Sequence, residues 1–154
     1  MDSVERFAAE ALLFQQWLLN GADDGADAVR EALTRVVRLY AAALELPRAW
    51  SDQLENATEE VDRLSHAEWR QAHDASKRLP LDMYGEVFNP TPLPAGDPVV
   101  GSLSDDLADI YRDVGTGLRA YEHGNRAAAV WEWGFGLRSH WGAHAASAVR
   151  ALHW

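Results

Sequence analysis

The distribution of proline constrains the fold of this chain more than any other feature of its sequence. Five of the six prolines fall within residues 79–101: Pro80, Pro90, Pro92, Pro94 and Pro98. Proline lacks a backbone donor and clashes with the preceding helical turn, so a continuous helix is excluded in this segment. Elsewhere only Pro47 interrupts the chain, which leaves the remaining residues free to form long helices.

Apolar residues recur at helical spacing before the proline-rich segment. A capping box formed by Asp2 and Glu5 predicts the start of a first helix. A second helix carries a broad apolar stripe over 29–44 and ends at Pro47. The acidic segment 51–64 keeps the helical period weakly and predicts a third helix that is mostly solvated.

Capping signals also delimit helices in the second half of the chain. A second capping box begins at Ser65. Ser102 or Ser104 caps a long helix, and Asn125 caps a last helix that runs without a break to about Leu152. The short turn between these last two helices predicts that they are antiparallel neighbours.

These signals predict an all-α fold, an up-and-down bundle of four to five helices that forms a single domain over residues 1–154. No convincing run of alternating β-branched residues argues for a strand. The long segment at about 79–101 is uncommon for a connection in a compact domain, and it is rich in apolar residues. We therefore expect an ordered loop that covers the bundle, with Tyr84 and Glu86 facing what lies beneath.

Charge and composition exclude several classes of function. The formal net charge of −10 argues against nucleic acid and against an anionic membrane surface as partners. The chain has no cysteine, so disulfides and thiol chemistry are excluded. The N-terminal segment lacks a basic region and a continuous apolar run, which predicts neither a signal peptide nor a membrane span. The expected location of this acidic protein is the cytoplasm.

The densest mixture of rings and ionisable groups lies within residues 131–144, which hold three of the seven tryptophans and two of the six histidines. His140 and His144 are one helical turn apart and share a flank. A row of carboxylates occupies one flank of the preceding helix: Asp106, Asp109 and Asp113. On the last helix, Arg138 falls on the opposite edge of the apolar stripe and needs a carboxylate partner, while Glu132 points nearly outward.

Three interpretations of these facing flanks remain open. The first is a structural network in which the histidines and Arg138 satisfy the aspartates across a helix pair. The second is a binding site for a small molecule or a divalent metal, with Asp106, Asp109, His140 and His144 as the metal ligands. The third is proton-transfer catalysis by a histidine that an aspartate orients. No serine or cysteine lies in a nucleophile motif, so covalent catalysis has no support.

Glycines inside the predicted last helix suggest close packing around its tryptophans. Each helical glycine costs about 1 kcal/mol relative to alanine, so glycines at 134, 136 and 142 indicate close backbone approach or room for a bulky neighbour. Trp131, Trp133 and Trp141 either fill the core, as aromatic stripes at helical spacing usually do, or line a pocket.

Three ordered blocks of the sequence resemble the bacterial DUF5063 family, a domain of unknown function. They are LPLDMYGEVFNP at residues 79–90, DDLADIYRD at 105–113, and the stretch from WEW at 131–133 through SHWG at 139–142. The blocks cover roughly the C-terminal half of the chain. The resemblance implies a small helical bacterial protein and supplies no activity, cofactor or catalytic residue.

Two functions therefore remain from the sequence. The first is a helical domain that binds an unknown protein partner or a small ligand without catalysis. The alternative is a metal-dependent enzyme with an Asp/His site between the last two helices, covered by Tyr84 or Glu86. No cofactor other than a divalent metal is suggested. The candidate site residues are Tyr84, Glu86, Asp106, Asp109, Asp113, Trp133, Arg138, His140, Trp141 and His144.

Overall fold

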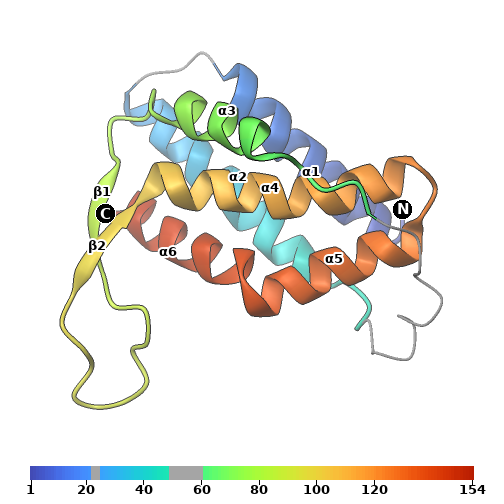
Figure 1. The fold of residues 1–154 in the computed structure, drawn as a ribbon. Helices are drawn as coiled ribbons and strands as arrows, with labels where there is room; N and C mark the ends of the chain where they lie inside the picture. Colours follow the sequence, from blue (N-terminus) through green and yellow to red (C-terminus); the bar gives the residue numbers. More distant parts are fainter. Residues whose placement is uncertain (22–24, 49–60) are drawn as a thin grey trace.

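The computed structural model describes residues 1–21, 25–48 and 61–154, and in this part of the chain six helices form a bundle with a small two-stranded sheet at one end (Figure 1). The helices are α1 (Ser3–Asn20), α2 (Ala26–Leu44), α3 (His66–Ser76), α4 (Leu103–Glu122), α5 (Arg126–Ser139) and α6 (Trp141–His153), and the strands are β1 (Met83–Glu86) and β2 (Val99–Ser102). The fold is thus mostly helical, as predicted, but the all-α description and the count of four to five helices are not exact. The helix expected over 51–64 lies largely outside the described residues.

Most helix ends coincide with the capping signals of the sequence. Both capping boxes are formed, at Asp2 before α1 and at Ser65 before α3. The side chain of Ser102 accepts a hydrogen bond from the first turn of α4, and Asn125 does the same for α5. Between α4 and α5, Gly124 adopts a positive φ of 82°, a conformation that glycine reaches without strain. These helices therefore begin and end for local reasons.

Helix α4 lies at the centre of the bundle and packs against α1, α3, α5 and α6 (Figure 1). Helix α2 packs against α1 and α6 on the far side. Buried apolar residues from every helix form one continuous core cluster. Among the described residues, no helix is both long enough and apolar enough to cross a membrane.

The tryptophans at 133 and 141 belong to this core. Both are fully buried. The indole nitrogen of Trp133 donates to the carbonyl oxygen of Val114 at 2.9 Å, and a Cβ at Gly117 would lie only 2.3 Å from that nitrogen. Gly117 therefore provides the space in α4 that the Trp133 ring fills. This packing brings α4 and α5 close together at this point.

The last helix expected from the sequence is two helices with a break at His140. This residue has φ −150° and ψ −83°, outside the helical region, and it separates α5 from α6. Trp141 turns into the core beside Gly136, where a Cβ would be 2.6 Å from the Trp141 ring. At Gly142 a Cβ would lie 1.9 Å from the carbonyl oxygen of Leu137, so only glycine allows this close approach. Burial of Trp141 thus accompanies a sharp change in helix direction.

The proline-rich segment does not cover the bundle as expected. Its ends pair as an antiparallel hairpin of β1 and β2, and the connection between the strands extends away from the helices (Figure 1). Side chains expected to pack on the bundle are exposed, including Met83, Phe88 and Val100. Because successive strand residues face opposite sides, Tyr84 and Glu86 point the other way and are largely buried. The hairpin therefore contacts the helices through one face of β1.

Candidate functional site

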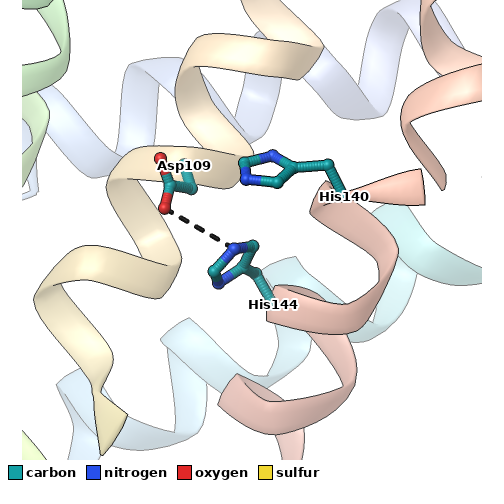
Figure 2. Close-up of side chains that lie close together, drawn as sticks. All are labelled: Asp109, His140 and His144. Atoms are coloured by element: carbon teal, nitrogen blue, oxygen red, sulfur yellow. Dashed lines mark ion pairs between the residues drawn. The ribbon is translucent and has the colours of Figure 1, made fainter. Parts of the chain in front are cut away.

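The break between α5 and α6 sets the two histidines against α4. His140 occupies the junction itself, and His144 lies one turn into α6. Figure 2 shows both imidazoles directed toward Asp109 on α4. The two rings meet edge to face with their centroids 4.7 Å apart. The predicted facing of histidines and aspartates is therefore present, and the break contributes to it.

Each histidine is held from behind by a carboxylate of α4. The Nδ1 of His140 lies 2.7 Å from Oδ2 of Asp113, and the Nδ1 of His144 lies 2.8 Å from Oδ1 of Asp106. A carboxylate only accepts hydrogen bonds, so in both pairs Nδ1 carries the proton. When the imidazole is neutral, its Nε2 lone pair is consequently left available on the opposite side of the ring.

Hydrogen bonds from α3 and from α4 itself orient the carboxylate of Asp109. One of its oxygens, Oδ1, accepts hydrogen bonds from Nε1 of Trp69 on α3 at 3.0 Å and from Arg112 at 2.8 Å. The other oxygen, Oδ2, lies 3.6 Å from Nε2 of His144. One potential ligand atom from each of Asp109, His140 and His144 lies within 4.8 Å of the others. Three donor groups therefore converge while their remaining atoms are engaged by neighbours.

Strand β1 adds one further residue, Tyr84, to this histidine–aspartate cluster. The hydroxyl of Tyr84 donates to Oδ2 of Asp106, whose other oxygen holds His144. Burial and the hydrogen bond to Asp106 raise the pKa of the Tyr84 phenol, so the phenol remains a donor at neutral pH. Asp106 in turn raises the pKa of the His144 imidazole, against the opposing effect of burial. Tyr84 thus fixes the carboxylate that orients His144.

The remaining candidates from the sequence lie outside this cluster. Trp133 and Trp141 fill the core, and Arg138 is exposed rather than held beside a buried carboxylate. Glu86 is buried in β1, where one oxygen accepts from the backbone of Val87. Its other oxygen has no partner among the described residues. The structure therefore brings together Tyr84, Asp106, Asp109, Asp113, His140 and His144.

Sequence reasoning missed two residues that support the cluster and several that form a pocket beside it. Trp69 and Arg112 hold Asp109, as described above. The pocket has a volume of about 320 Å³, and His140 and Asp113 form part of its wall. Its other principal residues are Arg63, Arg112, Trp131, Glu132 and Phe135. The sequence shows Glu132 between Trp131 and Trp133, but it does not indicate that Arg63 is the partner of this carboxylate.

Glu132 does not point into solvent as expected. Its side chain is 10% exposed, and its two oxygens lie 2.9 and 3.3 Å from the guanidinium nitrogens of Arg63. Burial raises the pKa of the Glu132 carboxyl, although Arg63 acts in the opposite direction. Asp113 contributes to the same increase through its charge. The carboxylate is therefore kept in a place where its charged form is disfavoured.

This burial predicts a pH-dependent effect of Glu132→Gln on stability. A carboxyl whose pKa is raised by folding stabilises the protein below its unfolded pKa, and this contribution is lost as pH rises through the folded value. The wild type should therefore lose stability relative to Glu132→Gln as pH rises above the usual glutamate pKa of about 4.3. Urea unfolding of both proteins at several pH values measures this difference. Arg63→Gln should move the loss to higher pH, whereas a difference independent of pH would contradict the prediction.

The fold and the site together define a class of protein: a six-helix bundle, over the described residues, with a histidine–aspartate cluster between α4 and the α5–α6 junction. The chain belongs to the DUF5063 family, a domain of unknown function, whose model matches residues 1–154. The resemblance seen in three sequence blocks is thereby confirmed over the whole chain.

Comparison with solved structures supports the fold. The crystal structure of protein BF1032 from Bacteroides fragilis superposes with a TM-score of 0.80 and 20% sequence identity. The match covers 98% of this chain and 90% of that one. At this identity the likeness extends to the fold alone. No functionally curated protein matches the chain.

Proposed function

We propose that this protein binds a divalent transition-metal ion through Asp109, His140 and His144. The observation that carries the proposal is the way both histidines are held, with Nδ1 on a carboxylate and the ring directed toward Asp109 (Figure 2), Nε2 of His144 lying 3.6 Å from its Oδ2. Metal-binding histidines almost always have such a partner, which selects the tautomer, orients the ring and increases the basicity of the ligand nitrogen. Asp113 and Asp106 have this role for His140 and His144, respectively.

The alternative of a purely structural network fits the observations less well. Polar networks that specify a core are buried and closed, because every unsatisfied group is costly there. The side chain of His140 is 42% exposed and that of His144 is 26% exposed. The cluster also contains three carboxylates, of which Arg112 pairs with Asp109 and Asp113. A dication would balance the remaining negative charge and is able to reach the ligands from solvent.

The donor set indicates the kind of ion. Two imidazoles and one carboxylate with open positions suit zinc or iron(II), whereas magnesium and calcium prefer sites built from oxygen. Donors at about 2.0–2.2 Å from one ion are at most roughly 4.4 Å apart. The three ligand atoms lie within 4.8 Å of one another, so small side-chain rotations would bring them into coordination distance.

A metal-dependent enzyme is the second candidate function. Three protein ligands leave at least one position of a tetrahedral ion for water or substrate, as in catalytic zinc sites. The observation that favours this candidate is the pocket beside His140, which would place a bound molecule near the ion. Metal binding without catalysis requires only Asp109, His140 and His144. Metal binding alone is therefore our primary proposal.

Titration of the metal-free protein with Zn²⁺ and with Co²⁺ tests the proposal. We expect one equivalent to bind, with a rise in melting temperature that increases with metal concentration. At one hundred times Kd, a ligand specific for the folded state stabilises it by about 2.7 kcal/mol. Calorimetry and elemental analysis measure the stoichiometry, and Mg²⁺ is the control ion that should have little effect. Metal binding is refuted if Zn²⁺, Co²⁺ and Fe²⁺ all fail to bind stoichiometrically and all fail to raise the melting temperature.

A further inference from the structure

The pocket beside His140 contains a second set of groups that the metal proposal does not use. Its lining includes the side chain of Glu132, which is almost buried, and Trp131 and Phe135 lie on the same helix, α5. These two rings are stacked, with centroids 4.9 Å apart and an angle of 7° between their planes. The positions at 131 and 135 are adjacent to Glu132 on the helix surface. A carboxylate thus lies next to an aromatic pair in an open pocket of about 320 Å³.

The guanidinium of Arg63 contacts this carboxylate as the guanidinium of a bound ligand would. Its NH2 atom lies 2.9 Å from one oxygen of Glu132 and its NH1 atom 3.3 Å from the other, a two-pronged contact. The side chain of Arg63 is 66% exposed, whereas that of Glu132 is 10% exposed. An exposed arginine gains little from such a pair and loses side-chain entropy by forming it. The carboxylate is therefore the fixed partner and the guanidinium is the replaceable one.

The chemistry of the pocket selects an organic cation. A planar guanidinium matches a carboxylate with two parallel hydrogen bonds and also stacks on aromatic faces. The other arginine of the wall, Arg112, pairs with Asp109 and Asp113 and does not occupy Glu132. The net charge of −10 also favours the approach of cations over anions.

We infer that this pocket binds a guanidinium group, carried by a small molecule or by an arginine side chain, which displaces Arg63 from Glu132. The bound group would form the two hydrogen bonds that Arg63 now forms, and the rest of the ligand would contact Trp131 and Phe135. Because the pocket uses neither Asp109 nor His144, the inference goes beyond metal binding and does not depend on it.

Binding of L-argininamide to Arg63→Ala, measured by calorimetry, tests the inference. Removal of the competing guanidinium should increase affinity at least tenfold over the wild type. L-Lysinamide, which has the charge without the planar fork, should bind more weakly than L-argininamide. A short capped peptide with one central arginine separates the two sources: tighter binding of the peptide indicates an arginine of a partner chain, and tighter binding of argininamide indicates a small molecule.

Further variants assign the effect to the pocket. Adding Glu132→Gln to Arg63→Ala should abolish binding, and Trp131→Ala should weaken it several-fold. His144→Ala should leave it unchanged, so loss of metal binding and loss of guanidinium binding are distinguishable. Circular dichroism of the free variants confirms that they fold. The inference is overturned if Arg63→Ala binds argininamide no more tightly than the wild type, or if the double variant binds as tightly as Arg63→Ala.

Discussion

His144→Ala is expected to reduce the affinity for Zn²⁺ by at least a hundredfold. The substitution removes one of three proposed ligands, and an ion held by Asp109 and His140 alone would depend on solvent for its other positions. Loss of an outer hydrogen-bond partner typically reduces affinity by about 10–100-fold, and loss of a direct ligand should exceed this. His140→Ala and Asp109→Ala should have effects of the same size. Competition with a chromophoric chelator measures all three affinities.

Two comparisons make this result specific to the site. Asp113→Asn should weaken zinc binding by about 10–100-fold, because His140 loses the charged partner that orients it. His153→Ala removes an exposed imidazole from the same helix as His144 and should bind zinc like the wild type. Equal losses in the His153 and His144 variants would indicate nonspecific binding and would contradict the proposed ligands.

The metal-free stability of the histidine variants separates a binding site from a structural network. A network residue leaves a buried partner unpaired when it is removed, which costs about 1–3 kcal/mol. His140 is only partly buried, so His140→Ala should change the free energy of unfolding of the metal-free protein by less than about 1 kcal/mol. Urea unfolding without metal measures this value, and a loss of several kcal/mol would favour the network.

Local signals were sufficient for most of the helix ends and for the two facing rows of side chains, but not for the break at His140. Capping residues such as Asp2, Ser65 and Asn125 act within one helical turn, so their effect is readable without tertiary structure. Helical phasing placed the two histidines on one flank and the three aspartates on another. The observed pairs, His140 with Asp113 and His144 with Asp106, lie across these flanks, although the position of His140 depends on the break as well as on helical phase.

Features that depend on contacts between distant segments were not readable. The break at His140 accompanies the burial of Trp141, and the glycines at 136 and 142 signalled close packing without indicating a change of direction. The hairpin has strands of only four residues, too short for a clear alternation. Trp69 approaches Asp109 from α3, forty positions earlier in the chain. No spacing rule connects such residues before the fold is known.

The second large effect is expected for Trp133→Ala, which should lower the free energy of unfolding by about 3–5 kcal/mol. The ring is fully buried, lies 4.7 Å from the ring of Phe7, and fills the space beside Gly117. Its removal would leave a cavity between α4 and α5 and would leave the carbonyl oxygen of Val114 without its donor. Total stabilities of about 5–15 kcal/mol are usual, so the loss is a large fraction of the whole. Urea unfolding monitored by circular dichroism measures it.

Trp131→Ala is the matched control, because it removes the same side chain two positions earlier in α5. Trp131 is only partly buried and stacks on Phe135 at the pocket, so its removal should cost about 1 kcal/mol or less. Equal losses in the two variants would contradict the assignment of Trp133 to the core. The contrast also separates the two uses of tryptophan in this helix. Trp133 keeps α5 against α4 and thereby His140 against Asp113, whereas Trp131 remains available to a ligand.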